Sequence, residues 1–295
     1  MPRVFLTGAS GFVGRRVLAT LRDRGHQVTC LGRSAGPGAV AGDLASPESY
    51  AAALVGHDVV VHLAAITGKA APDAYQRINV DGTRLLLDAA RRAGVARFLF
   101  CSSIAVTFAD TRRYHYARSK AAAETLVQDS GLRTAIVRPT IVAGAGSPVM
   151  SKLEALAGLP IVPVFGTGEV RLQPIHVDDL ADLIVDVVDA DRFGGDVFEL
   201  GGRDIMTVRE IMKRLRRLRT PQPPRFVPVP MSLLLAPLAL LEPLLGPLLP
   251  MTTGQLATFR FDGVARPNPL WAARRDGLAS LERTLASASS PSITS

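Results

Sequence analysis

The most constraining feature of the sequence is a glycine-rich turn between a short apolar strand and a helix. An apolar run at 3–7 is followed directly by Gly8-Ala9-Ser10-Gly11-Phe12-Val13-Gly14, and a helical pattern continues from there. Gly8 allows a tight turn, Gly11 lets the backbone approach a pyrophosphate, and Gly14 lets the helix pack closely on the strand. The helix start also supplies free N–H groups and a positive dipole end. The turn therefore predicts a dinucleotide-binding site.

Strand-like and helix-like segments then alternate along the chain, which predicts an α/β fold with a Rossmann-type doubly wound parallel sheet. Ligands of such sheets bind outside the carboxyl ends of the strands. Strands are expected at 27–31, 58–65, 96–103, 132–142 and 197–200, and helices from residue 46 and at 73–92, 115–127 and 180–188. The residues at the carboxyl ends of the strands are Gly8, Arg33, Asp43, Ala65, Ser103 and Pro139.

The chain of 295 residues is long enough for a large domain and a smaller one. Residues 1–145 and 174–202 are expected to form the dinucleotide-binding Rossmann domain. A smaller, mostly helical C-terminal cap that binds substrate is expected from 146–173 and 203–286. A capping box at 207–210 opens one of its helices. The small residues of 287–295 predict a disordered tail.

Tyr116 and Lys120 lie four residues apart in an Ala-rich helical pattern, so their side chains are expected on one helix face. A free phenol has a pKa near ~10 and is a poor base at neutral pH. A neighbouring ammonium favours the phenolate, which would make Tyr116 a general acid/base. This pair is the predicted centre of the chemistry.

The end of the strand at 27–31 bears on the choice of cofactor. A site that prefers NAD usually has Asp or Glu here to bind the adenosine ribose. This chain has Gly32 and Arg33 instead, and an arginine can pair with a 2′-phosphate. We therefore expect NADP(H) to be preferred, with NAD(H) as the alternative.

The chain is basic, with 34 Lys and Arg against 26 Asp and Glu and a formal net charge of +8. A basic excess favours anionic ligands or membrane surfaces. No recognition helix, zinc spacing or aromatic-studded basic strand accompanies it, so no nucleic-acid partner is expected. No cysteine–histidine cluster or paired carboxylate spacing indicates a metal site.

Cys30 and Cys101 each lie in an apolar strand-like run, which favours buried thiols in a reducing compartment. We find no signal peptide ahead of the first strand, so a cytoplasmic location is expected. His62 is expected to be a packed core histidine, Ser102 a strand-end hydroxyl satisfied by backbone, and Asp178 a helix cap.

Residues 231–251 are rich in Leu and carry Glu242 as their only charge. The segment approaches the length of a membrane span, but four prolines and a glycine would break one helix. Two short helices that cover the substrate cleft are the favoured interpretation. The alternative is peripheral contact of residues 209–251 with a membrane, supported by the basic helix pattern before Pro221. Both interpretations favour a small, apolar substrate.

Several motifs together resemble an extended short-chain dehydrogenase/reductase, the group of NAD(P)-dependent epimerases, dehydratases and hydroxysteroid- or flavonol-type reductases. They follow the order and spacing of that family over about residues 3–202. The matching motifs are Thr7-Gly8-Ala9-Ser10-Gly11-Phe12-Val13-Gly14, Gly42-Asp43-Leu44, His62-Leu63-Ala64-Ala65, Asn79-Val80-Asp81-Gly82-Thr83, Ser102-Ser103, Tyr116-Ala117-Arg118-Ser119-Lys120, Arg138-Pro139-Thr140 and His176-Val177-Asp178-Asp179-Leu180.

The resemblance implies a role for each matching residue. Tyr116 would be the acid/base, Lys120 would lower its pKa and bind the nicotinamide ribose, and Ser103 would hold the substrate oxygen. Asp43 and Leu44 would border the adenine, Ala64 and Ala65 the phosphates, and Pro139 with Thr140 the nicotinamide. The remaining cofactor contacts would come from Gly8, Ser10, Gly11, Phe12, Val13, Gly14, Leu63 and Asn79.

The leading hypothesis is an NADP(H)-dependent oxidoreductase that acts on a carbonyl or hydroxyl group by a Ser-Tyr-Lys mechanism. One alternative is a catalytically silent NADPH-binding scaffold, because residues 171–179 and 249–256 resemble a branch that contains a respiratory complex I accessory subunit. A second alternative is a sugar-nucleotide epimerase or dehydratase. The family usually has Tyr-Gly where this chain has Thr107-Phe108, which weakens that alternative. The oligomeric state stays open, with a homodimer among the choices.

Overall fold

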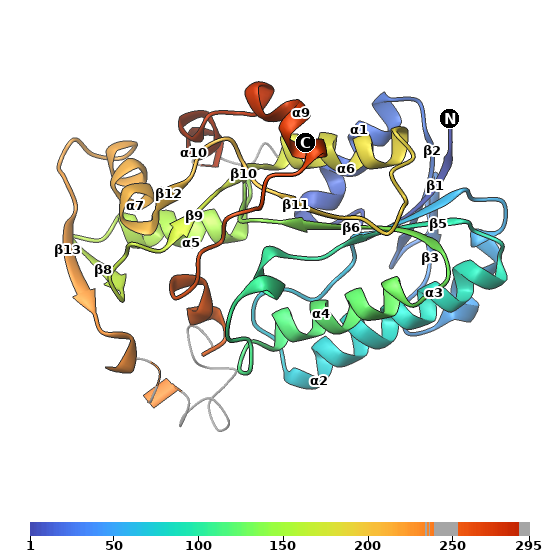
Figure 1. The fold of residues 1–295 in the computed structure, drawn as a ribbon, viewed down its shortest axis with the longest axis horizontal. Coiled ribbons are helices and arrows are strands. Elements are labelled where there is room, and N and C mark those ends of the chain that lie inside the picture. Colours follow the sequence, from blue (N-terminus) through green and yellow to red (C-terminus); the bar gives the residue numbers. More distant parts are fainter. Residues whose placement is uncertain (234, 236, 239–252, 289–295) are drawn as a thin grey trace.

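Seven parallel strands form the central sheet of the computed structural model, which describes residues 1–233, 235, 237–238 and 253–288 (Figure 1). All neighbouring strands of this sheet run parallel, as expected for a doubly wound α/β fold. The strand order is β3 (Ala39–Ala41), β2 (Gln27–Gly32), β1 (Arg3–Thr7), β4 (Val59–His62), β5 (Arg97–Cys101), β6 (Arg133–Pro139) and β11 (Val197–Leu200).

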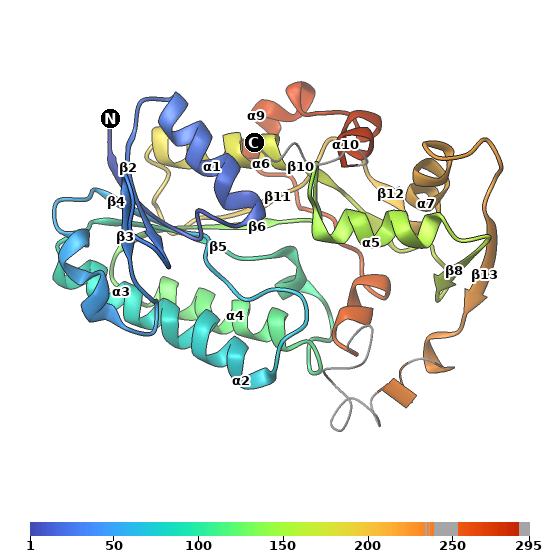
Figure 2. The same cartoon turned by 180° about the vertical axis from the view of Figure 1, so that it is seen from behind.

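Helices cover both faces of the sheet, and the strands are apolar on both faces for that reason (Figures 1 and 2). One face carries α1 (Phe12–Asp23), α6 (Val177–Asp189) and α9 (Pro269–Arg274); the other carries α3 (Gly82–Arg92) and α4 (His115–Gln128). Alternate residues of β1 divide between the two cores: Val4 and Leu6 pack in the first, and Phe5 in the second. The predicted Rossmann-type fold is confirmed.

A third apolar core lies away from the sheet, at one end of the molecule (Figure 1). Its central residues include Met150, Leu153, Ile211, Leu215 and Leu281. The elements around it are α5 (Pro148–Ala157), α7 (Val208–Arg217), α10 (Leu281–Ala288), the parallel pair β8 (Ile161–Phe165) and β13 (Arg225–Val229), and the antiparallel pair β9 (Arg171–Leu172) and β12 (Met206–Thr207). The division into 1–145 with 174–202 and 146–173 with 203–286 stays a prediction.

Most element bounds match the sequence pattern, and the capping box at the start of α7 is confirmed. Thr207 Oγ1 accepts from Glu210 N at 3.2 Å, and Glu210 Oε2 accepts from Thr207 N at 2.9 Å. At the start of α6, the expectation for Asp178 was wrong. His176 is the cap, because its Nδ1 accepts from Asp178 N at 3.3 Å.

Three segments differ from the expected elements. The helix expected from residue 46 is two 3-10 turns, η1 (Pro47–Ser49) and η2 (Ala51–Leu54). The helix expected at 73–92 is α2 (Pro72–Tyr75), a π turn η3 (Gln76–Asp81) and α3. The strand expected at 132–142 leaves the main sheet after Pro139, and β7 (Val142–Ala143) then pairs with β10 (Ile175–His176).

Two expectations concern the segment 231–251 and the C-terminal tail. Most of 231–251 and all of 289–295 lie outside the described residues, so the proposed cleft-covering helices and most of the tail are untested. Residues 287–288 belong to α10. Among the described helices, none has both the length and the apolar character needed to cross a membrane.

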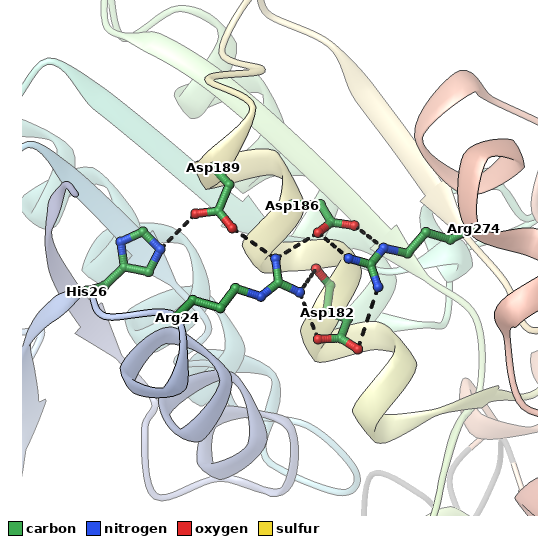
Figure 3. A network of polar contacts seen from close by, with 6 residues as sticks. All are labelled: Arg24, His26, Asp182, Asp186, Asp189 and Arg274. Atoms are coloured by element: carbon green, nitrogen blue, oxygen red, sulfur yellow. Dashed lines mark hydrogen bonds and ion pairs between the residues drawn. The ribbon is translucent and has the colours of Figure 1, made fainter.

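Charged side chains join α1, α6 and α9 across the first face (Figure 3). Arg24, at the end of α1, donates to Asp186 at 2.8 Å, to Asp189 at 2.9 Å and to Asp182 at 2.8 Å. The remaining contacts are His26 with Asp189 and Arg274 with Asp186 and Asp182. The three aspartates share one face of α6. Burial by itself lowers the pKa of Arg24, but the hydrogen bonds and charges of these carboxylates outweigh that effect and hold the pKa well above its usual range.

We expect Arg24→Ala to lower the free energy of unfolding by about 1–3 kcal/mol, because three charge-assisted contacts are lost. Arg16→Ala is the matched control. Within the described residues, Arg16 forms its ion pair with Asp178, and its side chain is 53% exposed against 25% for Arg24. Its loss should therefore cost less than about 1 kcal/mol. Urea unfolding of both variants provides the measurement. Equal losses of unfolding free energy in the two variants would contradict a stabilising role for the Arg24 contacts.

Candidate active site

The glycine turn forms a tight backbone cradle at the carboxyl end of β1. Gly8 has φ +78°, and a Cβ there would lie 2.6 Å from Ala64 N, so only glycine fits. A Cβ on Gly14 would overlap Gly8 O. Gly11 caps α1 without any capping side chain, and the first turn holds no acidic residue. The N–H groups of this turn, at Phe12 and Val13, are therefore open to an anion, so the residues present fit a dinucleotide pyrophosphate.

A buried hydrogen-bond chain joins the cradle to the opposite side of the sheet. Thr83 Oγ1 donates to Asn79 O at 2.7 Å, so it accepts from His62 Nε2 at 3.0 Å. His62 Nδ1 is then free to accept from Thr7 Oγ1 at 2.6 Å. Burial, with the charge of Lys120, lowers the pKa of His62 to about 3, so the ring is neutral. The prediction of a packed core histidine is confirmed.

Asn79 extends this chain toward the predicted catalytic helix. Its Oδ1 accepts from Ile66 N at 2.8 Å, and its Nδ2 donates to Ile66 O and to Ser119 Oγ, both at 3.0 Å. Ser119 Oγ in turn donates to Tyr116 O at 2.7 Å. Because its amide is fully engaged, we expect any contribution of Asn79 to cofactor binding to act through the loop that it holds. The predicted contacts Leu63, Ala64 and Ala65 lead into this loop.

The structure brings Ser103 and Tyr116 together. Ser103 caps the 3-10 turn η4 (Ile104–Thr107), where its Oγ accepts from Ala105 N at 3.2 Å. Its side chain is also hydrogen-bonded to Tyr116. The two hydroxyl groups come from residues thirteen apart in sequence, at the end of β5 and the start of α4. A substrate oxygen placed between them could contact both.

Lys120 lies on the same helix, almost fully buried. Its Nζ is 4.0 Å from the centre of the Phe100 ring, and no carboxylate forms an ion pair with it among the described residues. Burial lowers the pKa of Lys120 to about 8, although Cys101 and Glu124 favour its charged form. A buried ammonium without a carboxylate partner has hydrogen-bond donors to spare, so this position suits a ligand that offers hydroxyl groups as acceptors.

The expectation that Lys120 favours the Tyr116 phenolate is not met in this structure. Burial is the largest effect and raises the pKa of Tyr116 above its usual range, and Tyr114 and Cys101 raise it further. The hydrogen bond from Ser103 opposes this shift without overcoming it. Tyr116 therefore carries its proton at neutral pH, the state of a general acid.

Aromatic side chains line the neighbourhood of Tyr116, and the sequence interpretation did not assign them. The ring centroids of Tyr114 and Tyr75 lie 5.8 and 6.5 Å from that of Tyr116. Phe108 stacks on Tyr114 at 6.5 Å and contacts Phe261 at 5.7 Å. The replacement of the usual Tyr-Gly by Thr107-Phe108 was the sequence signal for this cluster, because it adds an apolar ring.

The other predicted cofactor contacts lie at the expected strand ends. Arg33 is exposed just after β2, with no ion pair recorded among the described residues. Asp43 is exposed and accepts from Ala45 N at 2.9 Å, whereas the Leu44 side chain is buried in the second core. Ser10 is exposed in the glycine turn. The cofactor contacts stay predictions, and a contact by Leu44 would come from its backbone.

The end of β6 is fixed by polar contacts. Thr140 Oγ1 donates to Gln173 O, so that its hydroxyl is engaged beside Pro139. Ser102 differs from the expectation: its Oγ is buried and has no hydrogen-bond partner among the described residues. Arg138, also of β6, donates to both oxygens of Glu124 of α4 at 2.9 and 2.6 Å, and lies 3.5 Å from Glu199. This group of side chains anchors α4 to the sheet.

We expect Gly14→Ala to destabilise the protein by about 1–3 kcal/mol and to abolish nucleotide binding, because the new methyl group overlaps the Gly8 carbonyl. Because an Ala in a helix is normally more stable than a Gly, a fall in the free energy of unfolding would have to come from the predicted steric overlap. Gly277→Ala is the control, since a Cβ there meets nothing within 4 Å. Thermal unfolding and fluorescence titration with NADPH would measure both effects.

We expect the affinity for NADPH to fall as the pH rises through about 8. Because the pKa of Lys120 is lowered to about 8, the ammonium that we expect to donate to the ribose is lost there. Titrations at pH 6.5 to 9.5 should give this step for the native protein and for the control Lys152→Met, which alters an exposed lysine. Lys120→Met should bind weakly without the step. A step that persists in Lys120→Met would assign it to another group.

The candidate site lies within a region that matches a known protein family. The model of the NAD dependent epimerase/dehydratase family matches residues 4–201, which contain every residue of the candidate site named from the motifs. Structural similarity extends further. MoeE5 in complex with UDP-glucuronic acid and NAD has a TM-score of 0.70 at 24% identity, with 97% of each chain covered. RMD from Pseudomonas aeruginosa complexed with NADPH has a TM-score of 0.61 at 24% identity, over 78% of this chain and 86% of that one. At this identity the likeness shows the fold alone.

Curated relatives include several enzymes. A 3-beta-hydroxysteroid dehydrogenase of Mycolicibacterium neoaurum is 32% identical over 214 residues, 60% of this chain and 58% of the relative. A ceramide reductase of Caulobacter vibrioides is 32% identical over 192 residues, 62% of this chain and 59% of the relative. A 2-alkyl-3-oxoalkanoate reductase of Stenotrophomonas maltophilia is 30% identical over 207 residues, 61% of this chain and 63% of the relative. The chain thus matches about three fifths of the length of each relative.

Proposed function

Because the chain belongs to the NAD dependent epimerase/dehydratase family, within the extended short-chain dehydrogenases/reductases, we propose that it is an NADP(H)-dependent oxidoreductase acting on a carbonyl or hydroxyl group. The observation that carries the proposal is the meeting of the Ser103 hydroxyl, at the start of η4, with the Tyr116 hydroxyl of α4, the helix that also carries the buried Lys120. Groups of this kind can orient a carbonyl oxygen and move its proton. A purely structural nucleotide site needs none of them.

The bound nicotinamide would supply or accept the hydride, and the protein supplies the rest. The cradle of Gly8, Gly11 and Gly14 would hold the pyrophosphate, and the Lys120 ammonium the ribose. Ser103 would donate a hydrogen bond to the substrate oxygen. Tyr116, whose raised pKa keeps the phenol protonated, would transfer its proton to that oxygen as a carbonyl is reduced. The same raised pKa makes the phenolate needed for the reverse reaction scarce at neutral pH.

The preference for NADP(H) rests on Arg33. Its guanidinium is exposed after β2, where the chain has Gly32 in place of an acidic residue. An arginine can bind a 2′-phosphate in a bidentate manner. No carboxylate follows β2 to accept hydrogen bonds from the ribose hydroxyl groups of NAD(H), so NADP(H) is favoured.

The substrate is proposed to be a largely apolar carbonyl compound or its alcohol. Phe108, Tyr114 and Phe261 form an apolar wall beside Tyr116. The relatives are named for steroid, ceramide and alkyl-oxoalkanoate substrates, all of which carry long or broad apolar parts. A sugar nucleotide would leave such a wall unused.

Oxidation of NADPH by a panel of ketones and aldehydes tests the activity, and Tyr116→Phe tests the mechanism. We expect Tyr116→Phe to lower kcat by about 100-fold or more, because the proton donor is lost, while NADPH still binds with unchanged affinity. Tyr50→Phe is the matched control, since the Tyr50 hydroxyl makes only a 3.4 Å contact in the core. NADPH binding without oxidation across the whole panel would favour the silent scaffold.

For the cofactor, we expect Arg33→Ala to weaken NADPH by about tenfold or more and to leave NADH nearly unchanged, because only NADPH carries the 2′-phosphate. Fluorescence titration of both nucleotides gives the two affinities. The control is Arg217→Ala, which removes an exposed arginine of α7. Equal losses for NADPH and NADH would remove the basis of the preference.

A further inference from the structure

A cavity of about 350 Å³ is lined in part by Tyr114, which neighbours Tyr116. Its lining is strongly charged, in contrast to the apolar wall beside it. The residues that matter here are Asp110, Arg112, Arg113, Tyr114, Gly254 and Arg260. Three arginines and one aspartate give the lining an excess of positive charge, so the cavity is suited to an anion.

One of the three arginines is already neutralised. Arg112 Nε and Nη2 donate to the two oxygens of Asp110, each at 3.1 Å, in a bidentate pair. Arg260 acts on the same carboxylate only at long range, and helps to lower the pKa of Asp110 to about 2 after the larger effect of Arg112. No ion pair is recorded for Arg113 or Arg260 within the described part of the chain. Two cations thus face the cavity without a close partner.

The cavity wall is held in place by close packing. A Cβ on Gly254 would lie 2.5 Å from Arg113 O and 2.8 Å from the Tyr114 Cα, so the segment after residue 253 presses directly on the backbone of 113–114. The Arg260 guanidinium lies 5.3 Å from the centre of the Phe261 ring, which orients it. Phe261 contacts Phe108, which stacks on Tyr114. Arg113 and Arg260 therefore border the same aromatic wall that lines the catalytic groups.

We propose that this cavity binds an acidic group of the substrate, a carboxylate or a phosphate, while the carbonyl of the same molecule lies at Ser103 and Tyr116. The inference rests on the proposed function and makes it more specific. Tyr114 contributes to both sites, because it lines the cavity and its ring centroid lies 5.8 Å from that of Tyr116. An apolar linker along Phe108 and Tyr114 would join the two ends. The substrate is then an amphiphilic oxo acid rather than a neutral ketone.

The first experiment compares charged and neutral forms of one molecule. The 4-oxo, 6-oxo and 8-oxo isomers of decanoate, each with its methyl ester, present the ketone at different distances from the acid. NADPH oxidation should give at least one acid whose kcat/KM exceeds that of its ester by about tenfold or more, and this excess should shrink as salt is raised. Esters that match or exceed their acids throughout would overturn the proposal.

The second experiment assigns the effect to named residues. Arg113→Ala and Arg260→Ala should each raise KM for the preferred acid by about fivefold or more, with kcat and the ester little changed. Asp110→Asn should have the opposite effect, because it removes the negative charge that competes with the ligand. Arg217→Ala is the matched control for net charge, and thermal unfolding checks that each variant is folded. Losses shared by acid and ester, or produced equally by Arg217→Ala, would contradict the assignment.

A third measurement separates this inference from the proposed function. Calorimetric titration with octanoate, octyl phosphate and methyl octanoate in the presence of NADPH requires no turnover. Octanoate or octyl phosphate should bind at least fivefold more tightly than the ester, and Arg113→Ala should abolish the difference. Preference for one of the two acids identifies the acidic group. Acid binding without any ketone reduction would retain the anion site and reject the oxidoreductase, whereas ketone reduction without acid preference would reject the anion site alone.

Discussion

A buried chain of hydrogen bonds connects the glycine turn after β1 to helix α4, and the geometry of the candidate site depends on it. It passes from Thr7 through His62 and Thr83 to Asn79, and then through Ser119 to the backbone of Tyr116. Each link has its donor and acceptor fixed by the next, so the imidazole has a single tautomer. In an apolar interior, an unmade link would cost the full desolvation of a polar group, which makes the arrangement all-or-none. The glycine turn and Tyr116 are therefore positioned by one continuous structure.

Much of the fold could be predicted because local signals agreed with the global arrangement. The strand–glycine–helix order at Gly8 and the capping box at Thr207 each depend on residues adjacent in sequence. The meeting of Ser103 with Tyr116 was expected from the roles that the family resemblance implies for these two residues. These features required no knowledge of how distant segments pack.

The features that were missed depend on tertiary environment. Burial decides the protonation of Tyr116, and no count of sequence neighbours reveals how deeply a phenol lies. His176 displaced Asp178 as the cap because the backbone before α6 aims the imidazole at the helix start. The charged cavity is lined by residues near 110 and by residues near 254 and 260. The local sequence of neither segment predicts that the two lie together. The π turn that carries Asn79 was likewise not predicted, because the helical pattern of 73–92 showed an interruption only at Gly82.

The return of the C-terminal third to the first face of the sheet has a consequence for synthesis on the ribosome. Leu270, Trp271 and Leu278 belong to the first core; Trp271 Nε1 donates to Gly201 O at 2.7 Å, and Asn268 Nδ2 to Glu199 O at 2.7 Å. A nascent chain that has emerged only to residue 202 has all seven strands but an uncovered apolar flank beside α6. The first core of the sheet therefore closes only after residues 268–278 have been synthesised, which delays its completion relative to the second core.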